Sequence, residues 1–205
     1  MTMSEARPRG GRLPRLARRA QLLDAARQVF VAVGYHAAAM DDIADRAGVS
    51  KPVLYQHFPS KLELYLALLD ATCDGLVDAV RAALASTTDN QQRVAATMRA
   101  YLDFVSDEDG TFRLVFESDL TGEPAVRERV DRVAHQCADA IADVIQEDTG
   151  GPREQALLLA AGLAGTAQVT ARWWLSSEGS IGRDEATRLL TTLAWRGLRG
   201  FPRAE

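Results

Sequence analysis

The stretch AGVSKPVLYQHFPSK, residues 47–61, decides the fold of this chain. Just before it, residues 40–47 carry apolar side chains at helical spacing, and a glycine ends that short helix. Ser50 is in position to cap a third helix, residues 50–58, and Pro52 falls in its first turn, where a missing N–H costs nothing. Two short helices around such a turn are the pattern of a helix-turn-helix.

Helical spacing extends over the rest of the chain. From residue 13 onward apolar residues recur every three or four positions, and no stretch alternates over the length of a strand. The prolines and most of the glycines fall at the boundaries between segments. The sequence therefore predicts an all-α fold of about nine helices, near residues 16–33, 40–47, 50–58, 60–86, 90–106, 111–120, 123–149, 153–177 and 183–200.

Charge is divided unevenly along the chain. The net charge is −4, but residues 1–61 hold ten Lys and Arg against five Asp and Glu, a balance of +5, which leaves −9 for residues 62–205. Cations beside a polyanion release its condensed counterions, so a basic head on an acidic body predicts binding to nucleic acid. For residues 1–12, an arginine-rich tail that only keeps the chain in solution explains the charge equally well.

The sequence lacks the residues that several classes of function require. No run reaches the roughly 20 apolar residues of a membrane span, and no apolar core follows the first arginines as in a signal peptide, so we expect a cytoplasmic protein without a membrane partner. Cys73 and Cys137 suggest no disulfide framework, and His135 beside one of them is too little for a metal site.

Catalytic motifs are missing as well. The sequence has no nucleophile elbow, phosphate-binding loop, dinucleotide fingerprint or HExxH motif, so we predict that the chain is not an enzyme and needs no cofactor. A helical enzyme is the weaker alternative. A helical adaptor, whose basic head binds acidic protein or membrane, is another, but it does not need the turn before the third helix.

The third helix carries side chains suited to reading DNA in the major groove. Lys51 can reach a guanine edge or a phosphate, while Ser50 can offer its hydroxyl or N–H to a phosphate. Leu54 and Phe58, four residues apart, should face inward. Lys51 and Lys61 are the only lysines. Either a genome-wide preference for arginine explains this or, as we favour, an ammonium is needed at both positions. Lys61 opens the next helix, where a cation is unfavourable unless an external anion binds it.

Residues 34–69, GYHAAAMDDIADRAGVSKPVLYQHFPSKLELYLALL, resemble the N-terminal domain of the TetR family of bacterial transcription regulators. The resemblance implies a disordered basic arm over residues 1–15, a helix-turn-helix domain over residues 16–60, and an effector-binding and dimerisation domain over residues 61–205. It also implies a homodimer on a near-palindromic operator of double-stranded DNA.

The resemblance implies further DNA contacts, at positions where the family commonly binds phosphate, in addition to those expected of the third helix. Pro52 and Val53 can touch thymine methyls, and Tyr55 and His57 can donate to phosphates. The DNA contacts that we predict are Tyr35, Ser50, Lys51, Pro52, Val53, Tyr55, Gln56, His57 and Lys61, with Arg15, Arg18 and Arg19 from the arm.

One departure from the family pattern concerns the start of the second helix. Ala38 and Ala39 stand where many members have threonines, the second of which caps that helix. We expect Asp42 to satisfy the helix start instead.

Two surfaces are expected in the body. The last two helices carry small and apolar residues that allow a second chain to approach, although the same pattern fits a core within one chain. The predicted dimer contacts are Leu157, Ala160, Ala161, Ala164, Leu189, Leu190, Leu193, Ala194 and Leu198. An aromatic and aliphatic stripe could line a pocket for an apolar effector or be plain core. It comprises Met98, Tyr101, Leu102, Val105, Phe112, Leu114, Val115 and Phe116.

A narrower resemblance concerns the effector. The segments SKLELYLALL, TTDNQQR, FRLVFESD and ARWWL are similar to those of FasR-type regulators of fatty-acid synthesis genes, which respond to long-chain acyl-CoA. This resemblance implies an apolar tunnel through the body that suits an acyl chain. The alternative is a TetR-type repressor of an efflux or catabolic gene that responds to an unrelated hydrophobic ligand.

Overall fold

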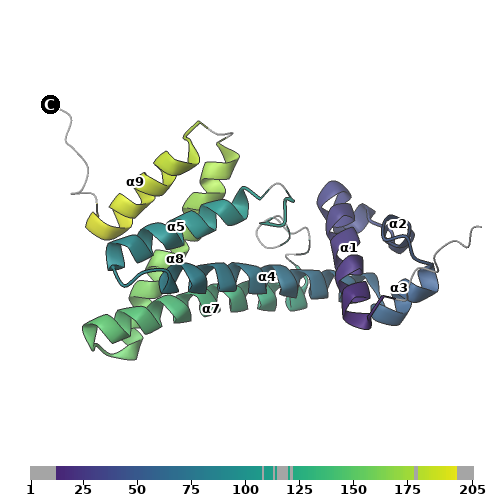
Figure 1. The fold of residues 1–205 in the computed structure, drawn as a ribbon, viewed down its shortest axis with the longest axis horizontal. Helices are drawn as coiled ribbons and strands as arrows, with labels where there is room; N and C mark the ends of the chain where they lie inside the picture. Colours follow the sequence, from purple (N-terminus) through teal and green to yellow (C-terminus); the bar gives the residue numbers. More distant parts are fainter. Residues whose placement is uncertain are drawn as a thin grey trace, which may run out of the picture.

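The computed structural model describes residues 13–107, 109–112, 114, 120, 122–177 and 180–197. Within these residues all regular structure is helical, and the predicted all-α fold is confirmed. The helices are α1 (Arg15–Ala37), α2 (Met40–Arg46), α3 (Lys51–His57), α4 (Lys61–Ala85), α5 (Asn90–Val105), α7 (Pro124–Thr149), α8 (Arg153–Ser176) and α9 (Arg183–Arg196) (Figure 1). Most of the helix predicted at 111–120 lies outside the described residues, as do residues 1–12 of the arm predicted over residues 1–15. Arg15, predicted as the end of that arm, instead begins α1.

Helices α1, α2 and α3 form a small head at one end of the molecule (Figure 1). Its centre consists of fully buried side chains from all three helices, among them Leu22, Ile43 and Leu54. Gly34 adopts φ +76°, so α1 is broken where the sequence predicts its end, although helical residues continue to Ala37. A residue with a side chain is strained at such a φ, which explains the glycine.

The helix starts follow the sequence in one case and depart from it in two. Ser60 accepts a hydrogen bond of 3.1 Å from the Glu63 N–H, which confirms the predicted cap of α4. Ser50 occupies the N-cap position of α3, but its hydroxyl makes no capping bond. At α2 the N-cap is Ala39, and no side chain, Asp42 included, caps it. The hydroxyl of Ser50 is thus not used to cap α3.

The long helix α4 runs from the head through the whole body (Figure 1). It packs against α5 and α7, α7 pairs with α8, and α9 lies on α5. Eleven α4 residues between Leu64 and Leu84 are buried, since its apolar positions recur every three or four residues. None of the helices in the described part of the chain is long and apolar enough to cross a membrane.

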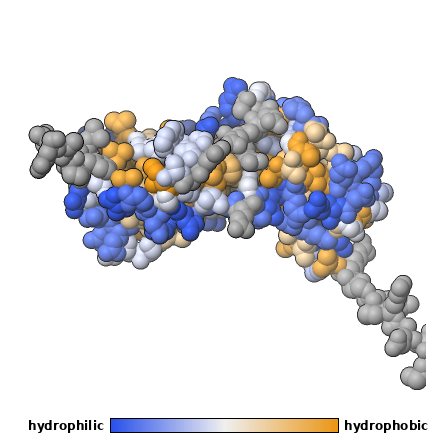
Figure 2. Space-filling model, turned by 90° about the horizontal axis from the view of Figure 1, so that it is seen from above, coloured by the Kyte–Doolittle hydropathy of each residue, from blue (hydrophilic) through white to orange (hydrophobic). Residues whose placement is uncertain are grey.

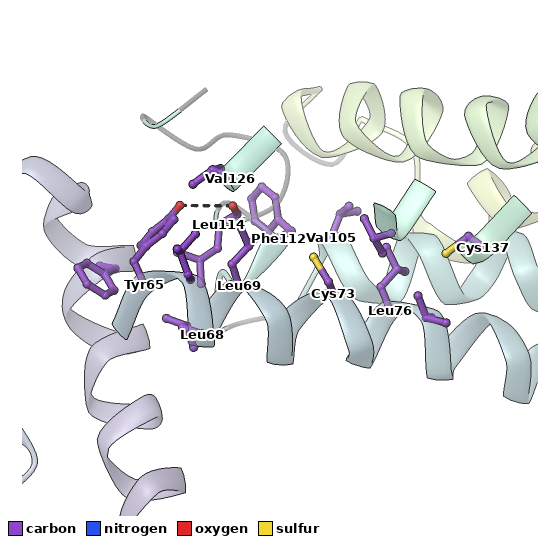
Figure 3. Close-up of a cluster of buried hydrophobic side chains, with 14 of the residues drawn as sticks. Tyr65, Leu68, Leu69, Cys73, Leu76, Val105, Phe112, Leu114, Val126 and Cys137 are labelled. Atoms are coloured by element: carbon purple, nitrogen blue, oxygen red, sulfur yellow. Dashed lines mark hydrogen bonds between the residues drawn. The ribbon is translucent and has the colours of Figure 1, made fainter. Parts of the chain in front are cut away.

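The half of the body next to the head is densely packed. Figure 3 shows some of its side chains, which come from α4, from the end of α5 and the segment after it, and from α7. Tyr65 donates a hydrogen bond of 3.4 Å to the Leu114 carbonyl and meets Phe30 of the head edge-on, with ring centroids 5.2 Å apart. The body core therefore continues into the head, and α4 carries both.

Candidate DNA interface and body cavity

The outer face of α3 leaves the predicted contact residues accessible. Ser50, Lys51, Pro52, Tyr55 and Gln56 are exposed, whereas Val53 and His57 are half-buried. Leu54 and Phe58 point the other way and are buried, as predicted. Helical spacing alone produces this division, since residues three and four apart share a face.

A groove of about 480 Å³ joins α3 to the start of α1. Five of the six residues that line the groove are predicted DNA contacts, and two of these five are arginines. The lining residues are Leu13, Arg15, Arg18, Val53, Gln56 and His57. The fold thus brings Arg15 and Arg18 next to the reading helix. Cations that could bind phosphates thus lie beside side chains that are predicted to contact bases.

Lys51 already has a partner within the head. Its ammonium lies 2.8 Å and 3.1 Å from the two carboxylate oxygens of Asp41 in the first turn of α2. The hydrogen bond to this carboxylate, together with its charge, raises the pKa of Lys51. Both side chains are exposed, so DNA can compete with Asp41 for the lysine.

Lys61 has an internal explanation that the sequence reasoning missed. Its ammonium donates to the carbonyl oxygens of Tyr35 (2.9 Å), Ala38 (2.9 Å) and His36 (3.4 Å), and lies 4.5 Å from the centre of the Tyr35 ring. A cation at the carbonyl end of α1 is favourable. These carbonyls account for Lys61 without an external anion, contrary to the expectation from the sequence.

Tyr35 and Arg19 also have contacts inside the head. The half-buried Tyr35 ring stacks on Phe30 at 5.9 Å and meets Tyr65 edge-on. Burial is the main cause that raises the pKa of Tyr35. The Arg19 guanidinium lies 4.4 Å from the centre of the Phe58 ring. Of the three predicted arm residues, Arg15 and Arg18 therefore line the groove and Arg19 packs against the core.

A cavity of about 330 Å³ lies at the end of the body farthest from the head. Helices α4, α5, α7, α8 and α9 contribute its mostly apolar walls: Leu84, Asn90, Arg93, Val94, Thr97, Met98, Ile141, Val144, Ile145, Asp148, Thr149, Leu163, Ala194 and Trp195. The volume is within the range of about 300–1,000 Å³ that small-molecule sites occupy.

This cavity is largely not the pocket that the sequence predicts. Only Met98 of the predicted set lines it, together with Ala194 from the predicted dimer set. Tyr101, Leu102, Val105, Phe112 and Leu114 are buried in the packed half instead, because large side chains fill the space between helices. Val115 and Phe116 lie outside the described residues.

The missed cavity residues carry a signal in the sequence. Asn90, Arg93 and Thr97 are spaced so that they share one face of α5 with Met98. The apolar stripe of α5 thus begins with a polar end, which is where a ligand that is only partly apolar can be recognised.

The face of α8 predicted to meet a second chain is mostly buried within this one. Ala160 and Ala164 pack against the chain's own helices, which corrects their assignment as dimer contacts, and Leu157 is half-buried in the same core. Ala161 is exposed, whereas Leu189, Leu190, Leu193 and Ala194 of α9 are half-buried. Leu198 lies outside the described residues.

Another face of the last two helices is apolar and exposed. On α8 and α9 the exposed large apolar side chains are Leu158 (75%), Leu159 (58%), Val169 (65%), Trp173 (64%) and Trp195 (46%). The hydropathy view shows apolar patches that interrupt the hydrophilic surface (Figure 2). The four on α8 share one side of that helix, whereas Trp195 also lines the body cavity. Large apolar residues gathered on one surface typically mark an interface.

The two cysteines are buried thiols. Desolvation raises the pKa of Cys73 to about 12 and also raises that of Cys137. Within the part of the chain that the structure describes, no three His, Cys, Asp or Glu side chains gather into a metal site.

Both halves of the chain match known families. Residues 22–68 match the family described as bacterial regulatory proteins, tetR family, and residues 90–197 match the tetracyclin repressor-like C-terminal domain. The chain is 50% identical, over 95% of its length and 89% of the relative, to the HTH-type transcriptional activator FasR of Mycolicibacterium smegmatis.

Solved structures share the fold. A TetR-like transcriptional regulator from Rhodococcus sp. RHA1 is 30% identical, with a TM-score of 0.71 over 93% of this chain and all of that one. The regulator FadR from Bacillus subtilis, in complex with stearoyl-CoA, is 16% identical, with a TM-score of 0.73 over 87% of this chain and 98% of that one. At that identity the likeness concerns the fold alone.

Proposed function

Because the chain belongs to the TetR family of bacterial transcription regulators, we propose that it reads a near-palindromic operator as a homodimer and that a long-chain acyl-CoA controls the reading. It is a sequence-specific DNA-binding transcription regulator and not an enzyme. It acts in the cytoplasm, where the bacterial chromosome lies, and its targets are genes of fatty-acid synthesis.

The observation that best supports sequence-specific DNA binding is the groove between α1 and α3. Arg15 and Arg18 line it together with Gln56 and His57, so cations that can bind phosphates lie beside side chains that can read base edges. Lys51 and Ser50 extend this surface at the start of α3, where the helix dipole also favours a phosphate.

The exposed apolar face of α8 and α9 supports dimerisation. Leu159, Val169 and Trp173 stand on one side of α8 and are 58–65% exposed, since none of the described helices covers them. A second copy would remove them from water. Two copies related by a two-fold axis would present two heads, which fits half-sites about 34–36 Å apart or a multiple of that spacing.

The body cavity supports a partly apolar effector. An acyl chain suits its aliphatic walls, and the likeness to the activator FasR favours the same effector class over an unrelated hydrophobic ligand. The fold itself can hold such a molecule, since the structurally similar FadR was solved with stearoyl-CoA.

Helix α5 connects the cavity to the head. Its first half lines the cavity, and the segment after its last residue contacts α1. There Asp109 lies 2.8 Å from the Arg27 guanidinium, and a Cβ at Gly110 would lie 2.8 Å from Val31. A shift of α5 on effector binding would therefore reach the head. Coupling of about 1–3 kcal/mol suffices for a 5- to 150-fold change in DNA affinity.

The first experiment is fluorescence anisotropy with duplexes taken upstream of fatty-acid synthesis genes and of the chain's own gene, each paired with a scrambled duplex. We expect one duplex to bind specifically at physiological salt and palmitoyl-CoA to change its affinity at least about fivefold. Equal binding of the specific and scrambled duplexes would contradict DNA reading. Specific binding that ignores palmitoyl-CoA would instead favour a different hydrophobic effector.

Two substitutions test the reading surface itself. Lys51→Ala should weaken specific binding roughly tenfold or more, because a base-edge or phosphate contact is lost. Asp41→Asn should strengthen binding to any duplex and steepen the salt dependence by about one unit, because Lys51 is released. Asp42→Asn is the matched control, since it removes the same charge from an exposed residue that has no contact with Lys51.

A further inference from the structure

Among the described residues, one buried hydroxyl lacks a hydrogen-bond partner. Four threonines of this part of the chain are buried, and three of them, Thr72, Thr187 and Thr191, donate to the carbonyl four residues earlier at 2.7–3.0 Å. Thr97 is 5% exposed, yet its hydroxyl makes no hydrogen bond to any described residue. The usual solution for a helical threonine is thus not used at this one position.

The Thr97 hydroxyl is also the clearest such case among the described residues. The other buried side-chain atom without a hydrogen bond is Nε of Arg129, which lies 2.7 Å from a carboxylate oxygen of Asp70 and is therefore neutralised. Native proteins rarely leave a buried polar group unpaired, and an exception calls for a water, an ion or a ligand as partner.

Thr97 lies in the wall of the body cavity, one turn after Arg93 on the same face of α5. The Arg93 Nε donates to the carbonyls of Leu84 (3.1 Å) and Thr87 (2.8 Å), which fixes the guanidinium beside the cavity. One terminal nitrogen donates to Asn90 at 3.1 Å and to Asp148 at 3.4 Å. The cavity thus has one polar end held in place by backbone contacts.

The donors at this end select the chemistry of a ligand. A guanidinium can only donate hydrogen bonds, and a threonine hydroxyl can donate one, so a group that suits both is an oxygen acceptor. Along the rest of the wall, Met98, Ile141 and Leu163 offer no polar atom to a ligand. An apolar chain that ends in a carbonyl fits both parts of the cavity.

The Thr97 hydroxyl oxygen has less than 1 Å² of accessible surface, so it reaches a ligand only if the side chain turns about χ1. We infer that this rotation occurs when an acyl group enters, and that the hydroxyl then donates a hydrogen bond to the acyl carbonyl oxygen near Arg93, while the alkyl chain lies along the aliphatic wall. The inference rests on the proposed function, because it assigns the orientation of the effector in the same cavity. The carbonyl can belong to a thioester or to a free carboxylate, and the choice of probes separates the two.

The test is isothermal titration of the full chain with palmitoyl-CoA, palmitate and S-hexadecyl-CoA, a thioether without the carbonyl. Thr97→Val replaces the hydroxyl by a methyl of similar size. We expect it to weaken the carbonyl-bearing probe about tenfold and to leave the thioether unchanged. Thr97→Ser, which keeps the hydroxyl, should restore the affinity.

A second readout separates this role from a structural one. Without ligand, Thr97→Val should raise the melting temperature, because an unpaired hydroxyl is removed from the interior. Thr72→Val is the matched control, since it removes a buried hydroxyl that has a partner. It should lower the melting temperature and leave the affinity for all three probes unchanged.

Each outcome decides something. Palmitoyl-CoA sensitive to Thr97→Val supports the thioester as the source of the carbonyl, and palmitate with the same sensitivity supports the carboxylate. Equal losses for all three probes, or no loss for palmitoyl-CoA and palmitate alike, would overturn the inference while leaving the acyl effector intact. If the unsubstituted chain binds none of the probes, the proposed effector itself fails.

Discussion

The two halves of α5 present the same helical face to very different surroundings. In the first half Asn90, Arg93 and Thr97 border a cavity of about 330 Å³. In the second half Tyr101, Leu102 and Val105 are at most 3% exposed within the packed core. The face is continuous, and what changes is how completely side chains fill the space opposite it, since α9 lies along both halves.

This contrast teaches where a ligand site lies in a helical body. An aromatic stripe attracts attention in the sequence, but large side chains stabilise a core by filling its volume. Space remains where the wall consists of medium-sized aliphatic and polar residues. The stability of the body should therefore depend on the second half of α5, and effector binding on the first.

The largest expected effect comes from emptying the packed half. Leu102→Ala should lower the free energy of unfolding by about 2–5 kcal/mol, because Leu102 is fully buried and its removal leaves a void. Leu163→Ala, in the wall of the cavity, should cost clearly less, since its side chain is already half-exposed. Urea unfolding of both variants measures the difference, and equal losses would break the comparison.

Larger side chains should also distinguish the two halves of α5, because the body cavity borders only the first half. Leu163→Phe should weaken palmitoyl-CoA binding about tenfold or more with a change of less than about 1 kcal/mol in stability, because the cavity can take the extra atoms. Val105→Phe has no space to fill and should cost about 1–3 kcal/mol. Titration calorimetry and urea unfolding test the pair. Retained acyl-CoA affinity in Leu163→Phe would place the effector elsewhere.

The packed half should also respond to alkaline pH. Burial raises the pKa of Cys73 from 9.0 to about 12, so the folded protein keeps a proton that the unfolded chain loses above pH 9. Stability is then fully present below pH 9 and falls from pH 9 towards pH 12, by up to about 1.4 kcal/mol per pH unit for this group. Cys73→Ala should flatten that slope, and urea unfolding across the range measures it. Cys137 and Tyr101, whose pKa values are raised as well, should preserve part of the slope.

The smallest effect concerns one hydroxyl of the packed half. The Tyr101 hydroxyl and the Cys137 thiol are buried close enough together for each to shift the pKa of the other. Tyr101→Phe removes the hydroxyl of this pair and should cost less than about 1.5 kcal/mol of stability, since a thiol is only a weak hydrogen-bond partner. Acyl-CoA affinity should not change, since Tyr101 does not line the cavity. A loss of affinity would show that the cavity extends past Met98 when occupied.

Local signals in the sequence predicted much of the fold. The described helices begin and end within a few residues of their predicted positions, because turns, glycines and caps such as Ser60 act over three or four residues. Leu54 and Phe58 are buried and Tyr55 is exposed, since helical spacing assigns faces without knowledge of the partners. The resemblance around the helix-turn-helix was carried by the same contiguous residues.

Local sequence signals could not predict contacts between distant segments of the chain. Lys61 lies 23–26 residues after the carbonyls it binds, and Ala160 is buried by helices other than its own. The cavity needs side chains from five helices. Sequence by itself determined which residues form helices and which side of the reading helix stays accessible, because those properties depend on neighbours along the chain. Only the tertiary structure decided which apolar faces are covered, where space is left, and which hydroxyl is without a partner, because each of these depends on how closely segments far apart in the sequence can pack.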